Sequence, residues 1–444
     1  MGLNGIQIFK LTPRTNCKEC GFPTCMAFSM KVAAGAVPID KCPHVSDEAK
    51  EKLSEATAPP MKTIAIGKDS IKMGGETVLF RHEKTLVNKS LFAVQFCDSM
   101  SDDDFQNKVA NIKKVDFERI GEQMNVECVA VKYDSDKEKY LKMIDDLKEL
   151  NKVFILVCED ADVAKEAIEK IKDEKPILMG ATKENIEEMV QIAKESKAVL
   201  GIKADSLEEL HDVVEKAEKA GYKDLIINPG TESIAKAFEN TVEIRRTALV
   251  GGDRVFGYPS MLFLNDLSKG NKYLQTALAS TFILKYGSII VLDDITYPSA
   301  LPVYGLRQNI YTDPQKPMRV EPKLYEFNNP TEDSPLLVTV DFALTYFVVS
   351  GEVERSKSSA WLMIPDSGGY SVLTSWAAGK FSGSVIKQMV KDSGIEEKLS
   401  KKVLIIPGKV AVLKGEIEED LPGWEVIVGP EEAMQLPKFL NELK

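Results

Sequence analysis

Four of the seven cysteines of this 444-residue sequence stand near its beginning, at Cys17, Cys20, Cys25 and Cys42. Three of them fall within nine residues, and the fourth comes alone, directly before Pro43. In a reducing compartment such crowding predicts metal ligation or redox chemistry rather than disulfides. Three thiolates on one tight loop and a remote Cys-Pro favour a [4Fe–4S] cluster, in which each iron takes one thiolate. A structural zinc site is the alternative, although zinc ligands more often come as two close pairs.

The residues between these cysteines suit a loop that curls around a cluster. Gly21 and Pro23 are turn formers, and backbone N–H groups there can point at sulfur. Thr24 is placed to cap a helix that starts near Cys25, and Gly35 is placed to end it. The sequence therefore predicts a loop and a short helix that together hold the cluster.

The other three cysteines have a different environment. Cys97, Cys128 and Cys158 each lie in an apolar run, where a free cysteine behaves as a small hydrophobic residue. We therefore expect them in protein cores rather than at a metal.

The sequence contains only three histidines, His44, His82 and His211. His44 follows Cys42-Pro43 closely, but four thiolates already complete a cluster, so we expect this side chain at the surface or beside the cluster. None of the three has the neighbours of a general base.

Composition narrows the class of protein. The net charge of −11 argues against a nucleic-acid-binding surface, and no apolar run of eighteen residues is present to span a membrane. The first residues lack the basic and apolar regions of a secretory signal. We therefore expect a cytoplasmic protein with sizeable cores, since 44% of its residues are hydrophobic.

Three domains are expected along the chain. A polar helix from Ser46 and the break at Pro59-Pro60 predict that the cluster domain covers residues 1–60, followed by a linker over residues 61–90 that packs on a neighbouring element. Proline and polar residues predict a second linker over residues 319–335.

Between these linkers, eight apolar runs alternate with amphipathic helical stretches and predict a TIM barrel over residues 91–318. The runs begin at Leu91, Val126, Val153, Pro176, Ala198, Asp224, Ser260 and Ser288. A doubly wound open sheet is the alternative.

Polar residues follow the predicted barrel strands, where barrel active sites lie. They are Asp98, Asp134, Asp160, Thr182, Asp205, Asn228, Asp266, Asp293 and Asp294. A ring of carboxylates can bind a metal or a polar substrate, but most of these residues also suit helix N-caps. Apart from His211, which lies inside a predicted helix, no histidine joins them, so we predict that the barrel serves as scaffold and interface.

The last part, residues 336–444, predicts a compact α/β domain with strands LLVTV, AWLMI, KVLII and WEVIV. The turns after these strands carry small residues that would let the backbone approach a large flat ligand. They include Gly368, Gly369, Ser371, Thr374, Ala377 and Ala378. A plain hairpin turn would contain Gly-Gly as well.

Together, NCKECGFPTCMAFSMKVAAGAVPIDKCP (16–43), the eight βα units and the closing α/β domain resemble the large (gamma) subunit family of corrinoid iron–sulfur proteins in the acetyl-CoA decarbonylase/synthase system. The resemblance covers essentially the whole chain. Further strings that carry it are FGYP (256–259), RQNIYTDPQ (307–315), ALTYF (343–347), IIPGKVAVLKGE (405–416) and GWEVIVGPEEA (423–433).

The resemblance implies a methyl carrier of the reductive acetyl-CoA pathway. A corrinoid cobalt takes a methyl group from methyltetrahydrofolate or a methyltetrahydropterin through a methyltransferase, and passes it to acetyl-CoA synthase. In this family the chain pairs with a small TIM-barrel subunit, and the corrinoid lies between that barrel and the C-terminal domain. The cluster at the four cysteines then returns Co(II) to Co(I), with electrons from a low-potential donor such as ferredoxin. In enzyme terms the subunit takes part in a Co-methyltransferase reaction.

The resemblance also implies corrinoid contacts in the C-terminal turns. The expected residues are Thr339, Thr345, Gly369, Tyr370, Ser371, Val372, Leu373 and Ala433. The Asp-x-His-x-x-Gly motif of histidine-ligated cobalamin domains is absent, so we expect a base-off corrinoid without a protein histidine.

Two other functions remain open on the sequence. The chain could be an iron–sulfur electron-transfer subunit of a different redox enzyme, with another cofactor in the C-terminal domain. A zinc-stabilised scaffold is the third reading of the same cysteines.

Overall fold

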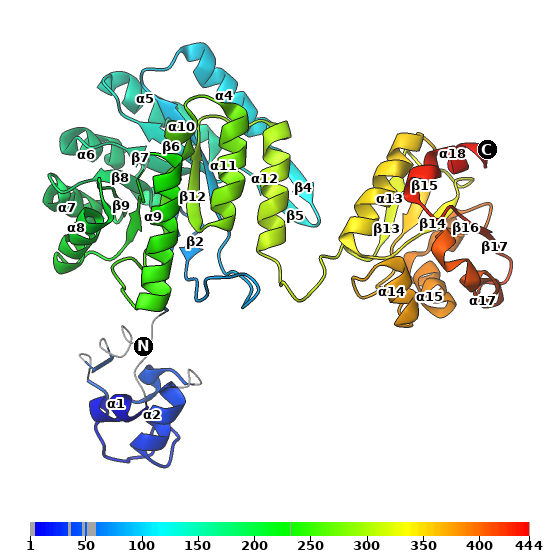
Figure 1. Ribbon diagram of the computed structural model, residues 1–444, viewed down its shortest axis with the longest axis horizontal. Helices are drawn as coiled ribbons and strands as arrows, with labels where there is room; N and C mark the ends of the chain where they lie inside the picture. The colour runs from blue at the N-terminus through cyan, green and yellow to red at the C-terminus, as the bar shows by residue number, and fades with distance from the viewer. Residues whose placement is uncertain (1–4, 34–36, 47–48, 51–58, 231, 444) are drawn as a thin grey trace. The chain divides into compact units, whose positions relative to one another are not determined.

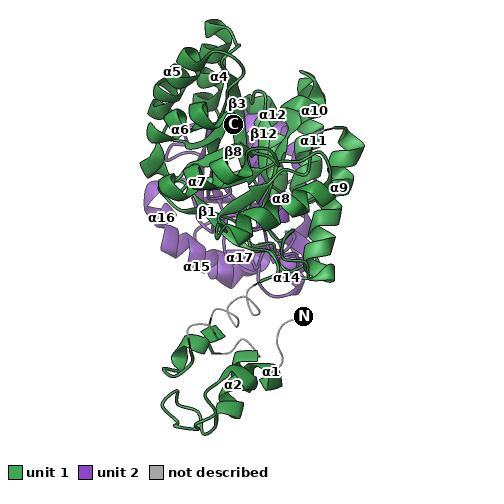
Figure 2. Ribbon diagram, turned by 90° about the vertical axis from the view of Figure 1, so that its left-hand side faces the viewer, with its two compact units in different colours: residues 1–115, 125–307 green, residues 116–124, 308–444 purple. Residues whose placement is uncertain are grey.

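The computed structural model describes residues 5–33, 37–46, 49–50, 59–230 and 232–443. Contacts divide the chain into two compact units (Figure 2). Unit 1 comprises residues 1–115 and 125–307, and unit 2 comprises residues 116–124 and 308–444.

The cysteine-rich segment forms a small helical structure, labelled in Figure 1. Its elements are α1 (Gly5–Leu11), α2 (Cys25–Ala33) and the 3₁₀ turn η1 (Ile39–Lys41). Thr24 caps α2 as predicted, because its Oγ1 accepts the backbone N–H of Ala27 at 3.1 Å. Gly35, expected to end this helix, and most of the helix expected after Ser46 lie outside the described residues.

The core of this segment includes two of the cysteines. Ile8, Phe28 and Val32 pack together with Cys20 and Cys42. The packing of apolar side chains therefore brings the loop cysteine and the remote cysteine onto the same small core.

Residues 61–90 contain a hairpin, β1 (Thr63–Ile66) and β2 (Ile71–Gly74), that packs on the barrel. The Lys62 N–H donates to the Gly257 carbonyl at 2.6 Å, and the Gly67 N–H donates to the Lys175 carbonyl at 3.0 Å. Both acceptors lie just before barrel strands, so the hairpin covers the amino ends of the strands and leaves the opposite end open.

The barrel is closed and its strands are parallel in the order β10-β11-β12-β3-β6-β7-β8-β9. The strands are β3 (Leu91–Cys97), β6 (Cys128–Lys132), β7 (Val153–Val157), β8 (Ile177–Ala181), β9 (Val199–Ile202), β10 (Leu225–Ile227), β11 (Ser260–Phe263) and β12 (Gly287–Leu292). They are almost wholly apolar because both faces of a parallel sheet are buried. The predicted TIM barrel is confirmed, and the open-sheet alternative is wrong.

Helices surround these strands (Figure 1). They are α4 (Asp102–Lys114), α5 (Lys137–Leu147), α6 (Ala161–Glu169), α7 (Ile186–Ser196), α8 (Leu207–Lys219), α9 (Ile234–Arg246), α10 (Leu264–Ser268), α11 (Lys272–Leu284) and α12 (Tyr297–Ile310). Short helical turns are η2 (Lys148–Leu150), η3 (Lys172–Glu174) and the π-helical η4 (Thr247–Gly251).

The prediction that the polar residues after the strands are mostly N-caps is wrong. Of those named, Asp160 caps a helix through its side chain, and it accepts from the N–H groups of Asp162 and Val163. The other barrel helices that have a side-chain cap in the described residues are capped by different residues, which lie one to five positions after those named. They are Ser101, Asp136, Ser206, Ser233 and Asn271.

A buried ion pair stabilises the barrel near the starts of its strands. The Arg307 Nη1 lies 2.6 Å from Glu127 and also donates to the Ser90 carbonyl at 2.8 Å. The guanidinium stacks 4.6 Å from the ring centre of Tyr304. The second Glu127 oxygen accepts the Phe92 N–H, so the pair ties α12 to two neighbouring strands.

Unit 2 is a five-stranded sheet with helices, in the order β13-β15-β14-β16-β17. Its strands are β13 (Leu324–Phe327), β14 (Leu336–Val338), β15 (Ala360–Met363), β16 (Val403–Ile406) and β17 (Glu425–Val428). Its helices are α13 (Ala343–Ser356), α14 (Val372–Ala377), α15 (Gly383–Ser393), α16 (Ile395–Lys398), α17 (Lys414–Asp420) and α18 (Leu436–Glu442), with the turns η5 (Gly408–Leu413) and η6 (Ala433–Gln435). Strands β14 to β17 are parallel, and β13 is antiparallel at the edge.

Two segments differ from the sequence prediction. Residues 319–335, expected as a linker, contain β13, which is a strand of the sheet and pairs with β15. Residues 116–124, expected inside the barrel domain, belong to unit 2 with most of the hairpin β4 (Asp116–Arg119) and β5 (Glu122–Asn125). There the Arg119 guanidinium stacks 5.0 Å from the Phe347 ring centre, and Gln308 donates to the Arg119 carbonyl.

Within the described part of the chain, no helix combines the length and the apolar character needed to cross a bilayer.

We predict that Arg307→Met lowers the free energy of unfolding by about 3–5 kcal/mol, because it leaves the Glu127 charge in the core without its partner. Urea unfolding followed by circular dichroism measures this change. The control is Lys236→Met, which breaks an exposed pair with Glu239 and should cost less than about 1 kcal/mol. Equal and small effects of the two substitutions would show that the buried pair does not stabilise the barrel.

Candidate cluster loop and cofactor pocket

In the loop around the first cysteines, residues with positive φ angles alternate with residues of ordinary backbone conformation. Arg14, Asn16, Lys18 and Gly21 adopt positive φ angles of 56°, 51°, 70° and 82°. Left-handed residues that alternate with ordinary ones turn successive N–H groups toward one side, and such concave backbone segments bind anions and iron–sulfur clusters. The loop is therefore shaped to surround a negatively charged group.

Hydrogen bonds join this loop to the start of α2. The Asn16 side-chain carbonyl accepts the Cys25 N–H at 2.8 Å, and the Asn16 N–H donates to the Cys25 Sγ at 3.4 Å. Hydrogen bonds to cysteine sulfur are among the interactions that set the potential of an iron–sulfur cluster. Asn16 therefore holds one predicted ligand in place from both sides.

The four predicted ligands differ in exposure. Cys20, Cys25 and Cys42 are buried, whereas Cys17 is exposed. Among the described residues no three of the four Sγ atoms lie within 4.8 Å of one another. The segment provides four cysteine sulfurs, which is one for each iron of a cubane cluster.

His44 lies beside this loop, as expected. Its Nε2 is 2.9 Å from a Glu19 oxygen, and both groups lie within 4.8 Å of the Cys17 Sγ. Both side chains are about half exposed. The contact is an exposed hydrogen bond next to one of the four cysteines.

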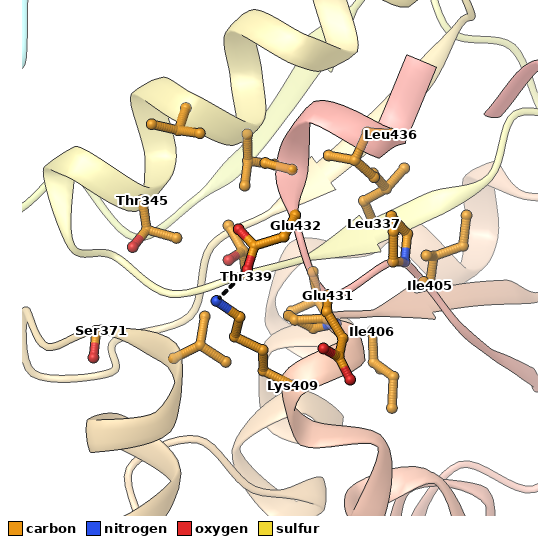
Figure 3. A pocket seen from close by; sticks show the side chains of 18 of the residues that line it. Leu337, Thr339, Thr345, Ser371, Ile405, Ile406, Lys409, Glu431, Glu432 and Leu436 are labelled. Carbon is orange, nitrogen blue, oxygen red and sulfur yellow. Dashed lines mark ion pairs between the residues drawn. The ribbon is translucent and has the colours of Figure 1, made fainter. Parts of the chain in front are cut away.

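Unit 2 contains a cavity of about 340 Å³ at the carboxyl ends of β14 and β16 (Figure 3). The chain leaves β14 for β15 on one side of it and later returns to β16 on the other side. Such a reversal of strand order parts the two loops and forms the crevice in which open α/β sheets bind ligands. The position of the cavity thus follows from the sheet topology.

The cavity wall is apolar with a few polar groups. Its floor comes from Leu337, Ile405 and Ile406, and helix α13 contributes Leu344 and Val348. The last two side chains are 64% and 48% exposed, although they are large and apolar. An apolar concave surface with few polar groups is typical of a site for a large organic cofactor.

Six of the eight predicted contact residues line this cavity. They are Thr339, Thr345, Ser371, Val372, Leu373 and Ala433. Gly369 and Tyr370 lie in the loop just before Ser371 and are not part of the wall. Tyr370 is 39% exposed and has the Lys380 ammonium 5.4 Å from its ring centre.

Several residues of the cavity wall were not indicated by the sequence. Leu344, Val348, Pro407, Lys409 and Glu432 line it and were not predicted as contacts. The Lys409 Nζ pairs with Glu432 at 2.9 Å between the turns after β16 and β17, as the dashed line in Figure 3 shows. If the sequence had shown that the strand LLVTV lies beside KVLII in the sheet, the turn after KVLII would have been predicted as part of the site.

The polar residues at the open end of the barrel mainly support loops. Asp98 is buried and accepts the N–H groups of Asp134, Ser135 and Asp136. Burial works against its charged form, but these donors outweigh it and lower the pKa of Asp98. Asp293 pairs with Lys108 at 2.8 Å.

Asp266 differs from these, because burial raises its pKa although Lys132 and Lys203 act in the opposite direction. It lines a polar cavity together with both lysines and Asn228. No residue in this set has the paired nucleophile and base of a covalent catalyst.

Of the other three cysteines, Cys128 and Cys158 are buried, as predicted. Burial raises the pKa of the Cys158 thiol to about 12, so it stays protonated and unreactive. Cys97 is only partly buried, because it is the last residue of β3 and its Sγ reaches the Ser99 hydroxyl.

The fold and the two sites define a class of protein with an iron–sulfur domain, a TIM barrel and an α/β cofactor domain. A family model for an Fe–S cluster matches residues 13–44, and the model for the CO dehydrogenase/acetyl-CoA synthase delta subunit matches residues 63–440.

Two relatives match this chain over nearly their whole lengths. The chain is 40% identical to the corrinoid/iron–sulfur protein large subunit of Moorella thermoacetica, over 99% of this chain and 98% of that protein. It is 35% identical to the acetyl-CoA decarbonylase/synthase complex subunit gamma of Methanopyrus kandleri, again over 99% and 98%. The chain therefore belongs to the family of large (gamma) subunits of corrinoid iron–sulfur proteins in the acetyl-CoA decarbonylase/synthase complex.

Among solved structures, a dihydropteroate synthase from Thermus thermophilus aligns with 56% of this chain and 100% of its own, at 13% identity and a TM-score of 0.40. The assignment of the barrel rests on the strand pairing described above.

We predict that Asn16→Ala accelerates loss of the cluster several-fold. The substitution removes the acceptor of the Cys25 N–H, which is worth about 1 kcal/mol. It also replaces asparagine, which tolerates the positive φ at this position, by alanine, which does not. The decay of visible absorbance in the presence of an iron chelator measures the rate. Asn151→Ala is the matched control, since Asn151 also has a positive φ of 50° but lies in the barrel domain. Identical decay rates for the two variants would contradict the role given to Asn16.

Proposed function

We propose that the chain is a methyl carrier that binds a corrinoid in the unit 2 cavity and a [4Fe–4S] cluster at its four amino-terminal cysteines. The observation that carries the proposal is the apolar cavity at the strand reversal, lined by six of the residues that the family resemblance had indicated. Membership of a family whose relatives are named corrinoid/iron–sulfur proteins supports the choice of ligand.

The residues of the cavity suit a corrin ring with amide side chains. Leu373, Val372 and Val348 offer apolar surface to the ring, while the hydroxyl groups of Thr345 and Ser371 are placed to hydrogen-bond amides at its edge. The bound cobalt supplies the nucleophile that accepts a methyl group and passes it on. No histidine is among the residues that line the cavity, so we propose that the corrinoid binds base-off, without a protein imidazole.

The cluster loop has the features of an electron donor. Three of the four thiolates are buried and the loop directs N–H groups to one side, which stabilises the additional negative charge of a reduced cluster. Cys17 is exposed, so an external reductant can approach from that side. We propose that the cluster returns oxidised cobalt to the Co(I) state.

The proposed partners follow from this cycle. The chain pairs with the small corrinoid iron–sulfur subunit, takes methyl groups from methyltetrahydrofolate or a methyltetrahydropterin through a methyltransferase, and delivers them to acetyl-CoA synthase. A ferredoxin-type donor reduces the cluster. The setting is the reducing cytoplasm, where the unpaired thiols of the chain persist.

Anaerobic purification tests the proposal. We expect about four iron atoms per chain and about one cobalt per assembled complex. Iron without cobalt would favour the electron-transfer subunit instead, and zinc without iron would favour the scaffold. Either result would overturn the proposal.

We predict that Cys20→Ala abolishes reductive reactivation of oxidised cobalt while methyl transfer from pre-reduced protein persists, because the cluster loses a ligand and the corrinoid site does not. Cobalt EPR follows reactivation, and transfer of labelled methyl groups follows the second activity. Cys97→Ala is the control and should reactivate normally, since Cys97 lies at the end of a barrel strand. Loss of methyl transfer in a folded Cys20→Ala protein would contradict the role assigned to the cluster.

A further inference from the structure

We propose that Asp341, together with Arg319, is a positioning residue of the corrinoid cavity. The inference rests on the proposed function and adds a residue that does not line the cavity itself. Asp341 follows β14 by three residues and is fully buried.

Three donors from two segments of the chain converge on the Asp341 carboxylate. One oxygen accepts the Ser367 hydroxyl and the Gly369 N–H, the latter at 2.8 Å, and the other accepts the Arg319 Nε at 2.6 Å. In return, the Asp341 N–H donates to the Ser367 Oγ at 2.9 Å. Arg319 also pairs with Asp366 at the start of the same loop.

These bonds connect two parts of the cavity wall. Asp341 lies between two residues that line the cavity, Thr339 in the turn after β14 and Thr345 in the first turn of α13. Ser371 and Leu373 line another part of the wall, and they follow directly on the loop that contains Ser367 and Gly369. Because one buried carboxylate holds the turn and the loop together, the distance between the walls depends on it.

The loop is built to accept this arrangement. Gly369 has a φ of 79°, and a Cβ at this position would lie 2.6 Å from the Arg319 Cγ. Arg319 therefore packs directly on the Gly369 backbone while its guanidinium pairs with Asp341. The buried Ser375 Oγ fixes the loop from its far side by donating to the carbonyls of Ser367 and Tyr370.

The substitution Asp341→Asn keeps the size of the side chain but converts one acceptor oxygen into an NH₂ donor. That NH₂ group must face either Arg319 or the Ser367 and Gly369 donors, so one side of the junction is lost whichever way the amide turns. We expect the two walls to separate, and corrinoid affinity to fall by roughly ten- to a hundredfold, since hydrogen bonds to charged groups are among the stronger ones.

The test is a titration of the full-length chain with aquocobinamide, followed by visible absorbance and by the change in the visible circular dichroism of the corrin ring on binding. Asp341→Asn should bind more weakly and, at saturation, should give an altered dichroism spectrum because the ring is held differently. Asp420→Asn is the matched control: it weakens the Lys387–Asp420 pair in the same unit, and Asp420 does not line the cavity. This variant should bind as the unsubstituted chain does.

Arg319→Gln provides a second variant, because the Arg319 side chain is 39% exposed and its loss is easier to tolerate than that of Asp341. It should also weaken binding and alter the spectrum, which decides the question if Asp341→Asn does not fold. Unchanged affinity and spectrum in the folded variants would overturn the inference but leave the proposed function intact. Failure of the unsubstituted chain to bind aquocobinamide would instead overturn the proposed function, and this inference with it.

Discussion

The order of the strands in unit 2 is the constraint on which the cofactor site depends. Strand β14 lies inside the sheet, and the chain goes first to β15 on one side and later to β16 on the other. The turns after β14 and β16 must therefore leave in opposite directions, and a crevice remains between them. Apolar side chains on α13 are exposed at this crevice because no element of unit 2 covers them within the described residues. The buried Asp341 joins the turn after β14 to the loop after β15, both of which continue into residues that line the crevice.

The shape of the cluster loop depends on the small core of its own segment. A segment this short cannot bury much apolar surface, and its core of Ile8, Phe28 and Val32 includes two of the cysteines themselves. Binding of a cluster would therefore contribute directly to the stability of the segment, because the ligands are part of its core. The alternating backbone around Cys17 and Cys20 and the two hydrogen bonds between Asn16 and Cys25 show how the loop is held in a shape suited to that group.

The sequence predicted the barrel well because parallel strands buried on both faces must be continuously apolar, and each of the eight runs became a strand. The residues that cap the amino ends of the barrel helices were predicted poorly from the sequence. Asp98 follows a strand as a cap would, but its carboxylate accepts three N–H groups of the neighbouring loop, a long-range contact without a local pattern. Residues 319–335 have the composition of a linker, yet Leu324–Phe327 pairs with β15, because an antiparallel edge strand tolerates polar neighbours. The family resemblance indicated six residues of the cavity wall, whereas Leu344 and Val348 of α13 and Lys409 required the three-dimensional structure.

The most direct test of the central claim is an experimentally determined structure of the chain reconstituted with a corrinoid. The account predicts that the ring lies at the carboxyl ends of β14 and β16, with Thr339, Thr345 and Ser371 beside it and no histidine of this chain on the cobalt. A corrinoid bound elsewhere, for example at the open end of the barrel beside Lys132 and Asp266, would contradict it.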